Sequence, residues 1–252
     1  MKLPKRELIP SGILKKARSF TAAAAAPLTR RCARVCLYSL IAVTSFYFLE
    51  QYLSHLTYAQ SSCLKMTIFL AAMLLYCVSY DEMDFFKRLF QPSRFRNEYR
   101  RGLFWGVLAA VSILGASAAF MLYIDSGSVR AQIMSATYRS ANYALASLYV
   151  IFVNTLLEEV FFRGFVFLRL YRSGNTVFAY LFSALLFALY HAYIFTATFS
   201  PPLIVITIFG LFLSGLLLCY LNARANNIFN GWITHTIASA AIMIVGFCLG
   251  NR

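Results

Sequence analysis

Long apolar runs separated by short polar segments dominate the chain. Runs of about 20 residues are long enough to span the hydrocarbon core of a membrane. Seven apolar stretches approach or exceed this length, near residues 35–54, 63–80, 102–124, 143–169, 176–199, 202–221 and 227–249. The pattern predicts an all-α fold, a polytopic transmembrane bundle of about seven helices within a range of six to eight. Composition agrees, because 60% of the 252 residues are hydrophobic and only 13% are charged, which is too apolar for a soluble domain.

The basic residues are distributed unevenly between the two predicted sides of the membrane. Nineteen Lys and Arg residues fall on the side that holds the N-terminus, and four fall on the other. The positive-inside rule therefore predicts an integral membrane protein with a cytoplasmic N-terminus. The same pattern fits a bacterial inner membrane and a eukaryotic endoplasmic reticulum.

The formal net charge of +14 indicates contact with anionic membrane lipids rather than with nucleic acid. The basic segments 1–34 and 81–101 lie beside predicted spans, where they meet lipid headgroups. Nucleic-acid binding would require basic residues interleaved with stacking aromatic residues on a soluble face, and the sequence has no such pattern.

The sequence divides the chain into three regions. Residues 1–34 form a basic cytoplasmic tail, residues 35–140 hold three helices without an assignable motif, and residues 141–250 hold the last four helices. In the three N-terminal helices we expect no deeply placed charge, since Lys65 falls at the outer end of the second. The third carries a face of small residues, including Gly102, that predicts close helix packing. We therefore expect the polar chemistry, and a catalytic core, in the last four helices.

An adjacent pair of glutamates lies in the middle of the fourth apolar stretch. Glu158 and Glu159 are the only acidic residues after Asp125. A charged side chain at the centre of a membrane helix costs roughly 2.5 to 3.5 kcal/mol, and such residues usually face a bundle interior or a watery cavity. This pair is therefore the first candidate for chemistry.

The two glutamates have different neighbours on a regular helix. Glu159 and Arg163 are four residues apart, so they share a face and can form an ion pair. Glu158 lies about 100° further round, one turn after Asn154. We therefore expect Glu159 to be structural and Glu158 to be available for chemistry.

Two of the three histidines lie in apolar helices near this pair. His191 is in the fifth stretch and His235 in the seventh, whereas His55 is in a predicted outer loop. A carboxylate in an apolar cavity is a good general base, and one histidine can orient the water that it activates. A second histidine can donate a hydrogen bond to an oxyanion. These parts are sufficient to hydrolyse an acyl bond without a nucleophilic side chain.

The order of these motifs resembles the CPBP family of intramembrane proteases. That family includes the CAAX prenyl endopeptidases and bacterial relatives with an Abi domain that are associated with bacteriocin processing and immunity. The resemblance covers roughly residues 140–250. The residues that carry it are Glu158-Glu159-x-x-x-Arg163, Phe187-x-x-x-His191 and His235 followed four residues later by a small polar residue.

The resemblance implies an intramembrane endopeptidase that acts on a membrane-anchored or lipidated protein. In the family pattern Glu158 corresponds to the catalytic glutamate that activates water, and His191 to the histidine that assists it. His235 corresponds to a residue that stabilises the oxyanion. Glu159 and Arg163 correspond to supporting residues.

The chain departs from the family pattern at Ser239. The family usually carries Asn or Asp at that place, four residues after the third-motif histidine, and a serine hydroxyl reaches less far than an amide. Asn154, Asn227 and Asn230 are candidates to compensate. The departure leaves open a catalytically weak member that acts as an immunity or binding partner. A proton-coupled transporter is the third alternative, although the chain lacks the repeated broken helices of inverted-repeat transporters.

The sequence is compatible with two mechanisms of water activation, with and without a zinc ion. Glu158, His191 and His235 are the ligand types of a catalytic zinc site. The helical His-Glu-x-x-His arrangement is absent, and the resembling family includes glutamate proteases. We therefore favour a mechanism without a cofactor, with zinc held by these three residues as the alternative.

Overall fold

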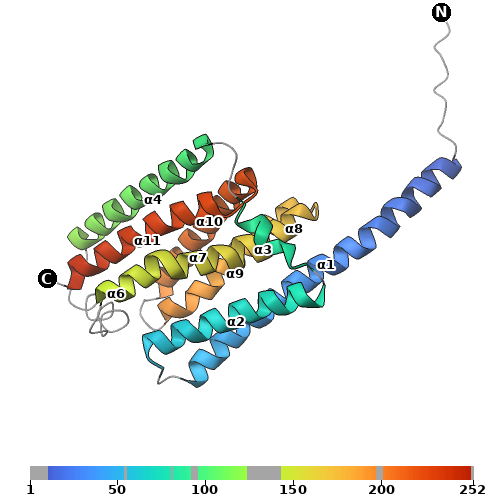
Figure 1. Cartoon of the computed structure of the whole chain (residues 1–252). Helices are drawn as coiled ribbons and strands as arrows, with labels where there is room; N and C mark the ends of the chain where they lie inside the picture. The colour runs from blue at the N-terminus through green and yellow to red at the C-terminus, as the bar shows by residue number, and fades with distance from the viewer. Residues whose placement is uncertain are drawn as a thin grey trace, which may run out of the picture.

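The protein is a bundle of long helices, seen in a computed structural model that describes residues 11–53, 56–80, 82–91, 96–123, 143–196 and 201–250 (Figure 1). These residues contain no strand, which confirms the predicted all-α class. His55 lies outside the described residues.

Each of the seven predicted apolar stretches corresponds to a helix. These are α1 (Ser11–Tyr52), α2 (Tyr58–Ser79), α4 (Arg96–Tyr123), a continuous helix over 143–172, α9 (Thr176–Thr196), α10 (Pro201–Ala225) and α11 (Phe229–Gly250). Among the described residues, six helices are long and apolar enough to cross a membrane, and the described apolar part of α9, Thr176–Ala192, is shorter. α1 begins inside the predicted tail, so part of the tail and the first span form one helix.

The helix over 143–172 occupies the middle of the bundle (Figure 1). Its central turns pack against α1, α2, α9, α10 and α11. α11 lies along α4, α9 lies along α10, and α1 lies beside α2. The predicted acidic pair is therefore surrounded by helices from both halves of the chain.

Local sequence signals explain where several helices begin and end. Thr57 caps α2 in a capping box with Gln60, which satisfies two otherwise free backbone donors. Gly174, with φ of 91°, and Asn226, with φ of 54°, adopt left-handed conformations in the turns that follow Arg172 and α10; such turns favour Gly and Asn. The Arg172 guanidinium donates to the Asn226 side chain at 2.8 Å, so these two turns are joined.

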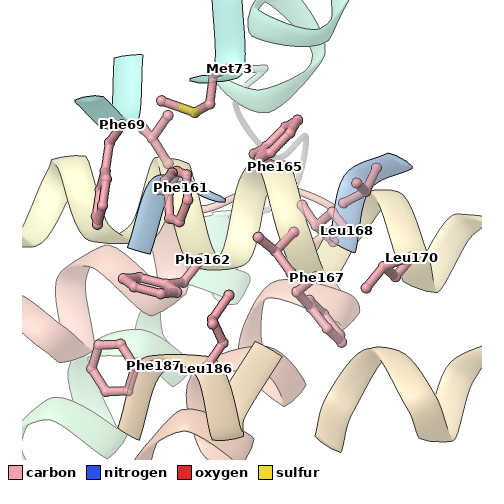
Figure 2. Close-up of a cluster of buried hydrophobic side chains, with 14 of the residues drawn as sticks. Phe69, Met73, Phe161, Phe162, Phe165, Phe167, Leu168, Leu170, Leu186 and Phe187 are labelled. Carbon is pink, nitrogen blue, oxygen red and sulfur yellow. The ribbon is translucent and has the colours of Figure 1, made fainter. Parts of the chain in front are cut away.

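Aromatic side chains fill the space between α2 and the central helix (Figure 2). Phe69 of α2 stacks on Phe161 with ring centroids 4.1 Å apart and meets Phe162 edge-on at 5.8 Å. The short helix α3 (Asp84–Leu89) brings Leu89 against Gly164, where any Cβ would overlap the leucine side chain. This packing anchors the N-terminal helices to the segment that carries the acidic pair.

The small-residue face predicted on the third apolar stretch is confirmed in its first two turns. A Cβ at Gly102 would meet Asn230 of α11 at 2.9 Å, and a Cβ at Gly106 would meet Ile237 at 2.7 Å. Gly115 has open space instead. Large apolar side chains such as Phe104 and Phe209 remain exposed on α4 and α10, as expected for surfaces that face lipid.

Candidate active site

The central helix departs from α-helical geometry on both sides of Glu158. It consists of α6 (Tyr143–Leu148), η1 (Tyr149–Asn154), α7 (Thr155–Glu158), η2 (Glu159–Leu168) and α8 (Arg169–Arg172), where η1 and η2 are π-helical. The assumption of a regular α-helix was therefore wrong for this segment. π-helical turns are rare and occur often at functional sites. Their wider turns change the direction in which each glutamate points.

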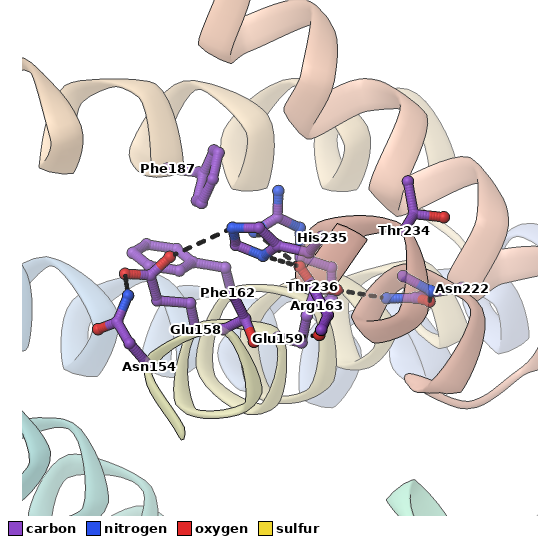
Figure 3. A network of polar contacts seen from close by, with 12 residues as sticks. Asn154, Glu158, Glu159, Phe162, Arg163, Phe187, Asn222, Thr234, His235 and Thr236 are labelled. Atoms are coloured by element: carbon purple, nitrogen blue, oxygen red, sulfur yellow. Dashed lines mark hydrogen bonds and ion pairs between the residues drawn. The ribbon is translucent and has the colours of Figure 1, made fainter. Parts of the chain in front are cut away.

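Glu158 is buried with its two carboxylate oxygens in different surroundings (Figure 3). The Asn154 amide nitrogen donates to Oε1 at 2.8 Å. The other oxygen, Oε2, lies 3.6 Å from Nε2 of His191 and 3.7 Å from Nε2 of His235. Oε2 has no hydrogen-bond partner among the described residues. The three predicted catalytic side chains are therefore brought together around one free carboxylate oxygen.

The other ring nitrogen of His191 is held by the backbone. Nδ1 lies 2.9 Å from the carbonyl oxygen of Phe187. A carbonyl can only accept, so Nδ1 carries the proton. In the neutral ring, Nε2 then presents its lone pair toward Glu158.

The Nδ1 of His235 also faces an oxygen acceptor, which here is a carboxylate. Its Nδ1 lies 3.1 Å from Oε1 of Glu159 (Figure 3). A carboxylate behind Nδ1 orients the imidazole and stabilises its positive charge when the ring is protonated, as in a Ser-His-Asp triad. The two histidines therefore point equivalent nitrogens at Glu158 but have different support.

Glu159 is the centre of a second set of contacts. The predicted ion pair with Arg163 is present, with Nη1 3.4 Å from Oε1, and both side chains are fully buried. Asn222 of α10 donates to Oε2 at 2.9 Å, and the backbone N–H of Gly231 donates to the Asn222 oxygen at 2.7 Å. Glu159 is therefore more than a partner for Arg163, because it connects α10 and Arg163 to His235.

Sequence reasoning did not identify Asn222. Its available signal was an amide within an otherwise apolar helix, and only the packing of α10 against the central helix shows what that amide contacts.

Gly231 allows α11 to approach this network closely. A Cβ built on it would overlap the side chains of Asn222 and Glu159. We expect Gly231→Ala to displace Glu159 and His235 and to destabilise the protein by about 1 to 3 kcal/mol, the usual cost of overpacking. Thermal unfolding of purified protein measures this. Gly115→Ala is the matched control, since open space surrounds Gly115 and alanine is the better helix former. Equal effects at the two positions would contradict the role of Gly231.

One protein family matches the part of the chain that contains these glutamates and histidines. Residues 140–241 match the family model described as type II CAAX prenyl endopeptidase Rce1-like. We call residues 140–241 the Rce1-like domain, after the family that this segment resembles. None of the curated proteins and none of the solved structures is similar enough to the chain to match it.

The Rce1-like domain contains both glutamates, Arg163 and both intramembrane histidines. The family that it matches is a protease family. Six helices of the described residues are long and apolar enough to cross a membrane, which supports an integral membrane protein. Residues 140–241 are therefore similar to a family of CAAX-type proteases.

The ring of Phe187 packs against Arg163 and both intramembrane histidines. The Arg163 guanidinium carbon is 3.9 Å from its ring centroid, a cation–π geometry. The ring of Phe187 also contacts His191 and His235, with centroids 4.4 and 5.8 Å away. One side chain therefore packs against three of the motif residues.

Three asparagines were candidates to compensate for Ser239. Asn154 contacts Glu158, whereas Asn227 and Asn230 contact other parts of the chain. Asn227 caps the backbone of Phe229 at 3.0 Å, and Asn230 packs against Gly102 of α4. Ser239 is buried, and no hydrogen bond within the described chain joins it to the two glutamates or the two histidines.

Lys65 corrects one expectation about the N-terminal helices. This side chain is 9% exposed, and its amine donates to the Asn154 side-chain oxygen. A buried charge therefore enters the site from α2, outside the Rce1-like domain. Hydropathy placed Lys65 near a helix end, but only the packing of α2 against η1 and η2 shows that the amine points inward.

Zinc held by Glu158, His191 and His235 is the alternative to a mechanism without a cofactor. Within the described residues, no group of three or more His, Cys, Asp or Glu side chains is arranged to hold a metal ion. Glu158, His191 and His235 are suitable donors by type but do not meet that geometric condition, and we derive no step through a metal.

Proposed function

We propose that this protein is an intramembrane endopeptidase that hydrolyses a peptide bond in a membrane-associated protein, with Glu158 as the base that activates water. The observation that carries this proposal is the free Oε2 of Glu158, which faces Nε2 of His191 and of His235 at 3.6 and 3.7 Å. A general base must lie within hydrogen-bond reach of the proton that it takes. A water between Oε2 and His191 can reach both groups.

In the proposed reaction the water oxygen attacks the carbonyl carbon while Glu158 takes the water proton. The forming C–O bond moves the carbonyl π electrons onto oxygen and produces a tetrahedral oxyanion. Collapse of this intermediate breaks the C–N bond, and Glu158 returns the proton to the leaving amine. His191 orients the water through its Nε2 lone pair, which its Nδ1–H bond to Phe187 supports.

His235 is the proposed donor to the oxyanion. Its Nδ1 faces Glu159, which orients the ring, and an Nε2–H of this ring is the proposed hydrogen-bond donor. Preorganised donors of this kind supply a large part of the rate enhancement in acyl transfer. Arg163 and Asn222 support the donor by holding Glu159 in place.

The proposed substrate is a membrane-anchored or lipidated protein, in line with the prenyl endopeptidase description of the matching family. Glu158 is near the middle of the 30-residue span Tyr143–Arg172, so a substrate must present its bond within the membrane. We propose that residues 141–250 are the catalytic core and that the N-terminus is cytoplasmic, as the distribution of basic residues supports.

A cleavage assay with the purified full chain in liposomes tests this function. The substrate is a synthetic peptide that ends in a prenylated CAAX sequence, and mass spectrometry identifies the two fragments. We expect cleavage by the wild type and a much slower reaction with the same peptide lacking the prenyl group. If the wild type does not cleave and membrane proteins accumulate equally in cells with wild type or Glu158→Gln, a binding or immunity role for a catalytically weak protein is favoured instead.

The proposed mechanism requires no metal ion. Preincubation with a chelator such as 1,10-phenanthroline, followed by its removal, is therefore expected to leave kcat unchanged. The same cleavage assay measures this, and a zinc protease treated in parallel is the control. Loss of activity that added zinc restores would contradict water activation by Glu158 alone and would favour a zinc site.

A further inference from the structure

Lys65 is a buried cation that the proposed mechanism does not use. It is the eighth residue of α2 (Tyr58–Ser79), about 10 Å from the start of the helix at 1.5 Å per residue. Its side chain is buried rather than extended to the membrane surface. Burial of an ammonium group is costly unless the group is paired, so the contacts of this amine require an explanation.

Two consecutive hydrogen bonds connect Lys65 to Glu158. The Lys65 amine donates to Oδ1 of Asn154, and Nδ2 of the same amide donates to Oε1 of Glu158 at 2.8 Å. An ammonium group can only donate, and an ionised carboxylate can only accept. The amide between them therefore has one permitted orientation. If Asn154 were rotated by 180°, its nitrogen would face the lysine and its oxygen would face the carboxylate.

This chain of contacts acts on the side of Glu158 that faces away from the histidines. Oε1 is held by Asn154, while Oε2 remains free toward His191 and His235. With Oε1 fixed, the carboxylate plane and the direction of Oε2 are determined. The positive charge behind the amide also strengthens its N–H donor, since hydrogen bonds polarise one another in series.

We propose that Lys65 is a positioning residue that locks the Asn154 amide and thereby aims Oε2 of Glu158 at the reacting water. The inference rests on the proposed function of Glu158 and extends the site to α2, outside the segment that matches the protease family. A role limited to helix packing would not depend on the Asn154 amide.

Steady-state kinetics of four variants in the liposome assay test the proposal. Lys65→Met keeps the length of the side chain and removes the amine. Asn154→Leu removes the amide, and the double variant removes both. Lys87→Met is the matched control, because Lys87 is exposed on α3 and pairs with the exposed Asp84.

We expect Lys65→Met to lower kcat by about 10- to 100-fold, the range typical of groups that orient a functional side chain from behind. KM changes by less than about 3-fold, since the substrate meets the opposite side of Glu158. The double variant is no slower than the slower single variant, because both changes break one chain of contacts. Lys87→Met retains wild-type kcat.

Three results would overturn the inference. Unchanged kcat in Lys65→Met, together with inactive Glu158→Gln, rejects the role of Lys65 and leaves the proposed function intact. Lower thermal stability of Lys65→Met with unchanged kcat of the folded protein assigns Lys65 to packing alone. Cleavage by Glu158→Gln at the wild-type rate rejects the proposed function, and the role of Lys65 with it.

Discussion

Replacement of Glu158 by glutamine is expected to lower kcat for peptide cleavage by about 10²- to 10⁴-fold, the usual contribution of a general base. Glutamine preserves the size of the side chain and its oxygen can still accept from Asn154, whose contact with Glu158 is 2.8 Å. What it loses is the ability of the second oxygen to take a proton from water. KM is expected to change little, because the carboxylate acts on water rather than on the substrate.

The control for this experiment is Asp84→Asn, which makes the same chemical change on the exposed helix α3. Asp84 pairs with Lys87 at 3.0 Å, and the amine lowers the pKa of this carboxyl group. The variant is expected to retain wild-type kcat. Residual activity of Glu158→Gln above about one tenth of wild type would contradict Glu158 as the base. A similar loss in Asp84→Asn would mean that the assay reports a general effect of charge.

Replacement of Arg163 by methionine is expected to lower the free energy of unfolding by about 3 to 5 kcal/mol, the typical cost of removing one partner from a buried ion pair. Both Arg163 and Glu159 are fully buried, with Nη1 and Oε1 3.4 Å apart. Without the guanidinium, Glu159 retains a charge that Asn222 and His235 must balance alone. The ring of Phe187 also loses its cation–π partner.

The double variant Arg163→Met/Glu159→Gln separates the buried charge from the loss of packing. We expect it to be more stable than Arg163→Met alone, because no unpaired carboxylate remains. Its kcat is expected to stay low, since His235 no longer has a carboxylate at Nδ1. Chemical unfolding in detergent measures the stability, and the cleavage assay measures kcat. A double variant that is less stable than the single one would show that charge pairing is not the main contribution of Arg163.

The contrast between Asn154 and Asn222 shows what sequence reasoning could reach. Asn154 precedes Glu158 by one turn, so helical spacing was sufficient to predict that the two share a face, and the structure contains that hydrogen bond. Asn222 is 63 residues from Glu159 in the chain. No periodicity relates residues on different helices, so the contact depends on how α10 packs against η2.

The sequence alone determined the apolar helices, the isolated acidic pair and the three motifs of the last four helices. These features follow from local physics. Hydropathy identifies the segments that can span a membrane, and a charge buried in such a segment is costly, so it marks a candidate functional site. The sequence also predicted the ion pair between Glu159 and Arg163, which the structure contains.

Only the tertiary structure decided how the two glutamates divide their contacts. The π-helical turns around Glu158, the support of His235 by Glu159 and the entry of Lys65 from α2 all depend on neighbouring helices. Backbone hydrogen bonds determine a helix from its own residues. The direction of a buried side chain is determined instead by the partners that neighbouring helices provide. The spacing of residues along the sequence does not contain that information.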